Sequence, residues 1–147
     1  VMDDRYSDVE ISTHSGGRLP SIGVNTGQDM LKYIEESGED FDVIAVDEAF
    51  MIDGSASAVL ELYRRGHCIV VSSLQLSATG NVFEEIRDMM PWATKIEVCP
   101  AVCTITGKDA YYTHRKHTGA EITVGGSDLY EPRCWEYHAF MNQKSER

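Results

Sequence analysis

The chain has 147 residues, of which 42% are hydrophobic and 25% charged, and its formal net charge at neutral pH is −11. These values are ordinary for one globular domain, and the acidic excess argues against binding of nucleic acid through its phosphates. No apolar run approaches the ~20 residues of a membrane span. We therefore expect neither a nucleic-acid nor a membrane partner.

The cysteine content points to a reducing compartment. No secretory signal opens the chain, so we expect a cytoplasmic protein whose cysteines bind metal or stay free rather than form disulfides. The four cysteines are Cys68, Cys99, Cys103 and Cys134.

The chain opens with a strand, a loop and a helix. Residues 8–13 alternate in hydrophobicity and predict a short strand. Residues 15–23 contain glycine and proline breakers and predict a loop. Residues 27–37 carry apolar side chains at helical spacing, and Gly38 follows as a plausible C-cap.

A β-strand, a helix and a second β-strand come next. Residues 41–48 and 67–73 are nearly continuous apolar runs, typical of parallel strands covered on both faces. Residues 55–66 between them predict a helix with a basic last turn and a glycine C-cap. The order and the short connections predict a right-handed parallel βαβ unit.

The character of the chain changes near Val98. Residues 81–91 predict one or two helical turns that end at Pro91. After Val98 the periodicity shifts to two, and Cys, Tyr, His, Thr and Gly dominate. We therefore expect an α/β core over residues 1–98 and a small β-rich lobe over residues 99–147.

Two adjacent carboxylates, Asp47 and Glu48, end the first apolar strand in the sequence VIAVDEAF. Ligands of open α/β sheets bind at the carboxyl ends of the strands. An aspartate there can hold Mg²⁺, and a neighbouring glutamate can accept a proton as general base. Alternatively, both carboxylates cap the next loop in solvent, and the local pattern leaves the two interpretations open.

Four stretches together resemble one known family. They are DDRYSDVEISTHSGG, DVIAVDEAF, AVCTITGKDAYYTHR and ITVGGSDLYEPRCWEYH, in that order over nearly the whole chain. They are similar to the matching segments of thymidine kinases of the cellular and viral type, which carry a zinc-bearing lasso domain. The last stretch is the most specific of the four.

The resemblance implies a fold and an activity. The fold is an α/β domain with a parallel sheet of P-loop NTPase type, here without its first strand and phosphate loop, plus a small zinc and lasso lobe. The activity is transfer of the ATP γ-phosphate to the 5′-hydroxyl of thymidine or deoxyuridine, which gives dTMP in nucleoside salvage for DNA synthesis. The resemblance also implies a homotetramer and Mg²⁺ as cofactor.

Site residues follow from the resemblance position by position. Asp47 would hold Mg²⁺, and Glu48 would take the proton of the attacking 5′-hydroxyl. Backbone groups of Val124 and Gly126 would meet the polar edge of the base, because only glycine lets backbone approach a ligand so closely. The rest of the base pocket would be lined by Phe50, Met51, Phe83, Thr113 and Tyr130.

Several positions depart from the family pattern. Phe50 stands where the family usually has Gln, and Gln75 stands where it has Asp. Ala78 replaces an aromatic residue and Thr79 lies near the position of an arginine. A larger base pocket and the loss of a phosphate-stabilising cation put base preference and turnover in question.

The sequence contains no G-x-x-x-x-G-K-[ST] phosphate loop, which phosphoryl transfer of this kind requires. The economical interpretation is an N-terminally truncated kinase, inactive as these 147 residues alone. The alternative is a non-catalytic family member that binds a nucleoside or pairs with a full-length copy. A free-standing zinc-ribbon module would explain the tail but not the strand VIAVDEAF.

The family's zinc site has two Cys-x-x-Cys or Cys-x-x-His pairs. Cys103 and Cys134 match the first cysteine of each pair, whereas the second positions hold Thr106 and Tyr137. A shifted Cys₃His site would add Cys99 and His138, each four residues from a matching cysteine. The alternative is that zinc is lost and the cysteines are small core residues.

Overall fold

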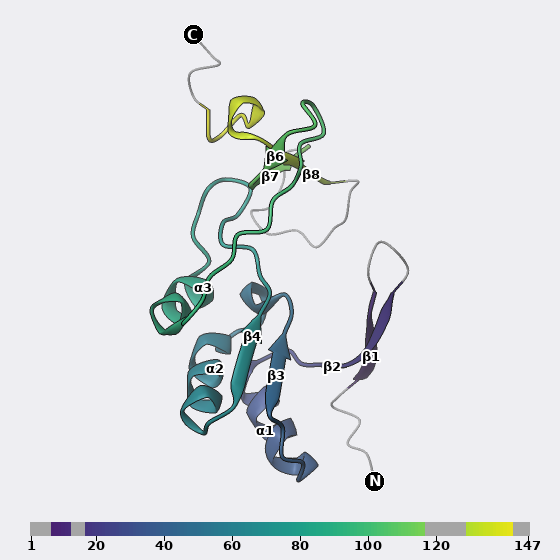
Figure 1. Ribbon diagram of the computed structural model, residues 1–147, viewed down its shortest axis with the longest axis vertical. Helices are drawn as coiled ribbons and strands as arrows, with labels where there is room; N and C mark the ends of the chain where they lie inside the picture. Colours follow the sequence, from purple (N-terminus) through teal and green to yellow (C-terminus); the bar gives the residue numbers. More distant parts are fainter. Residues whose placement is uncertain (1–6, 13–16, 117–128, 143–147) are drawn as a thin grey trace. The chain divides into compact units, whose positions relative to one another are not determined.

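The computed structural model describes residues 7–12, 17–116 and 129–142 (Figure 1). They belong to two compact units, Val1–Ser73 and Leu74–Arg147, and the domain boundary predicted near Val98 lies within the second. Both units contain helices and strands, which confirms the mixed α/β class. Each sheet among the described residues has two strands, so the larger P-loop sheet stays a prediction.

The first unit opens with an antiparallel hairpin of β1 (Ser7–Ser12) and β2 (Arg18–Gly23). The predicted first strand is thus confirmed, whereas the loop predicted over residues 15–23 is wrong for β2. Pro20 lies opposite Glu10, and proline is tolerated in a strand with a free edge because it lacks only the N–H. The ion pair of Arg18 with Glu10, 3.0 Å between Nη1 and Oε2, spans the hairpin.

Helix α1 (Gly27–Ser37) has strong signals at both ends. At its start, Thr26 Oγ1 accepts a hydrogen bond from the amide of Asp29, 3.1 Å away. The carboxylate of Asp29 accepts one in return from the amide of Thr26 at 3.0 Å, which completes a capping box. At its end, Gly38 adopts a left-handed conformation with φ of 64°, so the predicted glycine cap is confirmed.

Gly27, the first residue of α1, packs closely against the loop that precedes helix α2. The amide of Gly27 donates a hydrogen bond to the carbonyl oxygen of Asp53 at 2.8 Å. A Cβ atom at position 27 would come within 2.2 Å of the carbonyl oxygen of Gly54. Only glycine allows this close approach.

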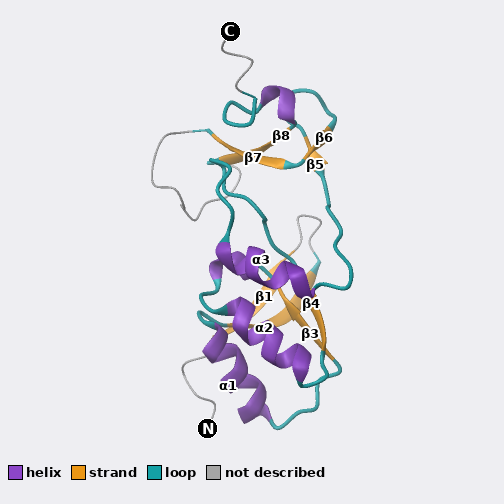
Figure 2. Cartoon of the chain, turned by 90° about the vertical axis from the view of Figure 1, so that its left-hand side faces the viewer, coloured by secondary structure: helices purple, strands orange, loops and turns teal. Residues whose placement is uncertain are grey.

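The predicted βαβ unit is present. Strand β3 (Val43–Val46), helix α2 (Ser55–Arg64) and strand β4 (Cys68–Val71) follow in order, and the two strands pair in parallel, Val43 opposite Cys68. Helices α1 and α2 lie on one side of this strand pair (Figure 2). The buried apolar residues of the unit are Met30, Leu31, Val46, Ala49, Ile52, Ala56, Ala58, Val59 and Leu62.

The other face of the strand pair is open in the described structure. Val43 and Val70 are each 54% exposed, and Ala45 and Cys68 are exposed beside them. The expectation that both strands are covered on both faces is therefore not met by the residues described.

The second unit begins with a short helical segment. Helix α3 (Glu84–Met89) continues into the 3₁₀ turn η2 (Met90–Trp92), which contains Pro91. This confirms the short helix predicted to end there. Every helix in the described parts of the chain is too short or too polar to span a lipid bilayer.

Short antiparallel pairs build the rest of the second unit. Strand β5 (Ala101–Val102) pairs with β6 (Asp109–Ala110), and β7 (Tyr112–Arg115) pairs with β8 (Tyr130–Arg133). The 3₁₀ turn η3 (Trp135–Tyr137) follows. Cys103, Ala110 and Cys134 form a small buried cluster here.

Candidate functional site

The two carboxylates Asp47 and Glu48 directly follow β3, as the sequence predicted. Glu48 begins the 3₁₀ turn η1 (Ala49–Met51) in a left-handed conformation, with φ of 53° and ψ of 36°. It is the one non-glycine residue with positive φ among those described. Such a conformation is costly for a side chain with a Cβ, and residues held in it cluster at functional sites.

Contacts with neighbouring elements hold this turn in place. Ala49 is fully buried, and its amide approaches the carbonyl oxygen of Ser72 at 3.4 Å. The amide of Phe50 donates to Ser73 Oγ at 3.2 Å. The buried hydroxyl of Ser55 donates to the carbonyl oxygen of Ala49 at 2.9 Å. Residues at the end of β4 and at the start of α2 therefore hold the backbone of the turn that follows Glu48.

Sequence reasoning missed these three serines as supports. Ser72 and Ser73 directly follow β4, so their position at the carboxyl end of a strand beside β3 was a usable signal. Ser55 gave no such signal, because a serine at the start of a helix ordinarily serves as a cap.

The electrostatics favour proton transfer at Glu48. Burial raises the pKa of Glu48 above its usual range, and the negative charge of Asp47 raises it further. A carboxylate with a raised pKa is a better proton acceptor when ionised. The environment of the turn thus fits the role of general base.

The carboxylate pair also suits a magnesium ion that bridges to phosphates. Mg²⁺ in such sites uses one or two protein carboxylates, and phosphate oxygens and water complete its shell. A cation beside Asp47 and Glu48 would relieve the repulsion that contributes to the raised pKa of Glu48. The residues present therefore fit Mg²⁺, although the described residues contain no cluster of three or more possible ligands.

The predicted base-pocket residues come from both units. Phe50 and Met51 lie in η1 of the first unit, half-buried and 46% exposed respectively. In the second unit, Phe83 directly precedes α3, while Thr113 in β7 and Tyr130 in β8 belong to neighbouring strands. Their assembly into one pocket stays a prediction, and Val124 and Gly126 lie outside the described residues.

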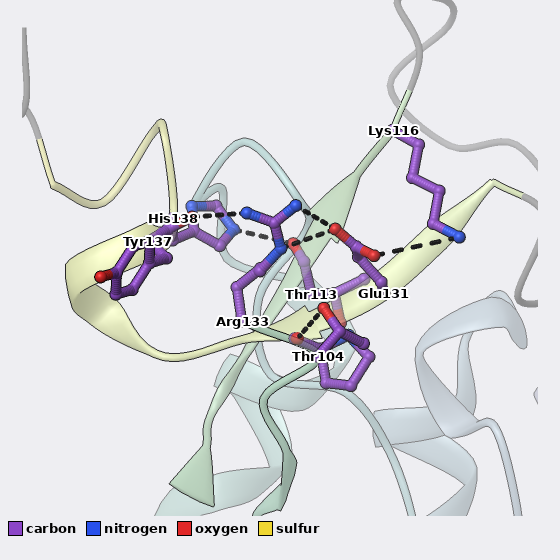
Figure 3. A network of polar contacts seen from close by, with 8 residues as sticks. Thr104, Thr113, Lys116, Glu131, Arg133, Tyr137 and His138 are labelled. Atoms are coloured by element: carbon purple, nitrogen blue, oxygen red, sulfur yellow. Dashed lines mark hydrogen bonds and ion pairs between the residues drawn. The ribbon is translucent and has the colours of Figure 1, made fainter. Parts of the chain in front are cut away.

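The strands that carry Thr113 and Tyr130 are joined by a polar network (Figure 3). Arg133 pairs with the carboxylate of Glu131 and donates from Nη1 to the carbonyl oxygen of Tyr137 at 3.0 Å. Lys116 Nζ lies 3.9 Å from Glu131 Oε2, on the side of the network nearest the ends of β7 and β8.

Further backbone hydrogen bonds hold the described strands together beside this network. The amide of Lys116 donates to the carbonyl oxygen of Leu129 at 2.9 Å. The amide of Thr104 donates to the carbonyl oxygen of Pro132 at 3.2 Å, which ties the turn after β5 to β8. The predicted lasso, residues 104–133 between Cys103 and Cys134, therefore contains the hydrogen-bonded strand pair of β7 and β8.

His138 contacts the strand of Thr113 rather than a metal. Its side chain is 2% exposed, and Nε2 lies 2.9 Å from the carbonyl oxygen of Thr113. Nδ1 accepts a hydrogen bond from the amide of Met141 at 3.2 Å. The ring packs edge-on against Tyr112 and His114. Both nitrogens are thus engaged by the chain itself.

Two of the predicted zinc ligands are brought together, and two are not. Cys103 and Cys134 share the buried cluster of the second unit, whereas Cys99 is exposed. Burial raises the pKa of Cys103, but hydrogen bonds from the Thr106 hydroxyl and from the amides of Cys134, Ile105 and Thr106 outweigh it and lower the pKa to about 6. The shifted Cys₃His set is not assembled in the described structure.

A parallel βαβ unit with a carboxylate pair at the carboxyl end of its first strand is the arrangement of α/β proteins that bind nucleotides or phosphates. The comparison with protein families is more specific. The family model "Thymidine kinase" matches residues 1–138, so the chain belongs to the thymidine kinase family. This is a family of nucleoside kinases that use ATP and thymidine.

Proposed function

We propose that this chain carries the nucleoside-activating part of an ATP-dependent thymidine kinase. The observation that supports this most is the position of Glu48. It follows the parallel strand β3 in a left-handed conformation that contacts with three serines support, and its pKa is raised. Family membership supplies the reaction, phosphorylation of a nucleoside, in which a proton acceptor such as Glu48 is needed.

In the proposed step, Glu48 accepts the proton of the thymidine 5′-hydroxyl. The hydroxyl oxygen then forms a bond to the γ-phosphorus of ATP while the bond from that phosphorus to the bridging oxygen breaks, which gives dTMP and ADP. Asp47 would hold Mg²⁺, which neutralises phosphate charge when bound.

The nucleoside base would lie against Thr113 and Tyr130. Backbone of Val124 and Gly126 would meet its polar edge, and Phe50, Met51 and Phe83 would complete the pocket. The hydrogen bond between Lys116 and Leu129 supports this assignment, because it holds β7, which carries Thr113, beside β8, which carries Tyr130. A homotetrameric assembly also stays a prediction.

The alternative is a chain that binds thymidine without phosphorylating it. The absence of a G-x-x-x-x-G-K-[ST] sequence in the 147 residues favours this alternative, because no other segment offers a comparable cradle for the β- and γ-phosphates. We therefore expect these 147 residues alone to show no ATP-dependent phosphorylation.

Steady-state kinetics on a chain extended by a phosphate loop would test the proposal. Glu48→Gln should lower kcat about 10²–10⁴-fold and leave thymidine binding intact, because the amide keeps the shape but cannot accept the proton. Glu39→Gln, which changes an exposed glutamate, is the matched control. Equal kcat in wild type and Glu48→Gln would reject Glu48 as the base.

Hydrogen exchange separates binding from turnover. Thymidine should slow amide exchange across residues 111–130 and leave β3 nearly unchanged, because only the lasso closes over the nucleoside. Gly126→Val should abolish the effect. Unchanged exchange across residues 111–130 at saturating thymidine would show that this segment is not a nucleoside lid.

A further inference from the structure

Each cysteine of the buried pair in the second unit begins a hydrogen-bonded turn. After β5, the amide of Gly107 donates to the carbonyl oxygen of Cys103 at 2.9 Å. After β8, the amide of Tyr137 donates to the carbonyl oxygen of Cys134 at 3.2 Å. The residue three positions after each cysteine is therefore held in a defined turn, and these residues are Thr106 and Tyr137.

The hydroxyl of Thr106 acts on both cysteine sulfurs. Its Oγ1 lies 3.6 Å from Cys134 Sγ. A hydrogen bond from the same hydroxyl is the largest of the causes that lower the pKa of the Cys103 thiol. The hydroxyl has one proton, which it gives to the Cys103 sulfur, and its oxygen can accept the S–H proton of Cys134. Thr106 thus links the two turns.

Each sulfur has further partners from the chain. Hydrogen bonds from the amides of Cys134, Ile105 and Thr106 also lower the pKa of the Cys103 thiol. Cys134 Sγ lies 3.3 Å from Glu136 Oε2. Both sulfurs thus have polar partners inside a buried cluster. Buried polar groups need such partners, because they have lost their contact with water.

The remaining candidate ligands are engaged elsewhere. His138 would have to break its contact with either Thr113 or Met141 to offer a nitrogen to a metal. Cys99 lies in an exposed stretch, apart from the cluster. A structural zinc site needs four ligands, so the donor set present does not fit zinc.

We propose that the hydroxyl of Thr106 takes the place of zinc between Cys103 and Cys134, and that the second unit folds without a metal. The two turns are then linked by hydrogen bonds rather than by coordination. This inference is independent of the proposed kinase activity, because it concerns the stability of the second unit only.

The first experiment compares metal content with stability. Protein produced in zinc-supplemented medium should contain far less than one zinc per chain by elemental analysis. Its melting temperature should be the same with and without a strong zinc chelator. About one zinc per chain, together with a lower melting temperature in chelator, would overturn the proposal.

The second experiment changes the hydroxyl. Thr106→Val keeps the shape of the side chain but removes the interactions of the hydroxyl with the sulfurs and with the amide of Lys108, so it should lower the melting temperature. Thr94→Val, at an exposed threonine of the same unit, should not. An unchanged melting temperature in Thr106→Val would reject the bridging role of the hydroxyl.

The third experiment rebuilds a metal site. The double variant Thr106→Cys/Tyr137→Cys supplies two new sulfurs three residues after Cys103 and Cys134. It should bind about one zinc per chain and become sensitive to chelator. Absence of zinc from the folded double variant would show that Thr106 does not occupy a metal-ligand position. This readout does not depend on Thr106→Val remaining folded.

Discussion

Nε2 of His138 lies 2.9 Å from the carbonyl oxygen of Thr113. Because the amide of Met141 donates to Nδ1, Nδ1 carries no proton and Nε2 is the atom that donates to Thr113. A buried histidine after the last 3₁₀ turn thereby fixes the strand whose threonine is proposed to contact the nucleoside base. His138 is a positioning residue in this arrangement.

Replacement of His138 tests this role. His138→Ala should destabilise the protein by about 1–3 kcal/mol, because the partly buried carbonyl oxygen of Thr113 loses its donor. Thymidine affinity should fall as well. His138→Gln, whose amide can still donate, should restore part of both losses, as measured by urea unfolding and calorimetric titration. Thymidine affinity that is unchanged in His138→Ala would contradict the positioning role.

The left-handed conformation of Glu48 predicts an inverted order of stability. Glu48→Gly should be more stable than Glu48→Ala by about 1 kcal/mol, because glycine adopts positive φ without strain. At Asp47, which has no positive φ, Asp47→Gly should instead be less stable than Asp47→Ala. Denaturant unfolding of the four variants measures these differences in the free energy of unfolding. If glycine and alanine rank in the same order at both positions, the backbone at Glu48 is not strained.

The raised pKa of Glu48 predicts a pH dependence of stability. The folded state binds the proton of Glu48 more tightly than the unfolded state, so stability falls as pH rises from the usual glutamate pKa of ~4.3 through the higher folded value. Glu48→Gln lacks this penalty. The variant should therefore gain stability relative to wild type across that interval and keep the gain at higher pH.

Unfolding curves of wild type and Glu48→Gln between pH 4 and pH 8 measure this difference. Adding Asp47→Asn to both proteins should shrink it, since the neighbouring charge is the second cause of the raised pKa. A stability difference that is constant with pH would show that Glu48 titrates normally.

The buried hydroxyl of Ser55 predicts a coupling between helix α2 and the turn that begins at Glu48. Ser55→Ala should cost about 1 kcal/mol, because the carbonyl oxygen of Ala49 loses one of its two donors and keeps only the amide of Ile52. Ser57→Ala, at an exposed position of the same helix, is the control and should be nearly neutral. In a catalytically complete chain, Ser55→Ala should also lower kcat more than it raises KM for thymidine.

The elements with strong local signals were predicted correctly. The capping glycine after α1, the two apolar strands and the helix between them follow from periodicity and end signals alone. Strand β2 was missed because Pro20 and the glycines before it read as breakers, whereas pairing with β1 overrides that local preference. Long-range pairing is not encoded in a window of a few residues.

The candidate site was predictable only where its residues are marked by local features of the sequence. Asp47 and Glu48 could be located because strand ends are local features, and the structure places both after β3. The left-handed turn at Glu48 and the hydroxyl of Thr106 between two sulfurs could not, since each depends on contacts with distant residues. The same limit applied to His138, whose partner Thr113 lies 25 positions earlier.

The open face of the β3–β4 pair has a consequence for the protein in solution. Its valines Val43 and Val70 are exposed. Among the described residues, β3 and β4 pair only with each other, so each strand has an unpaired outer edge. Such surfaces template contact between molecules, and the net charge of −11 keeps the molecules apart. Raising the ionic strength shortens the range of that repulsion. The colloidal stability of this chain is therefore greatest in dilute, low-salt buffer and declines as salt is added.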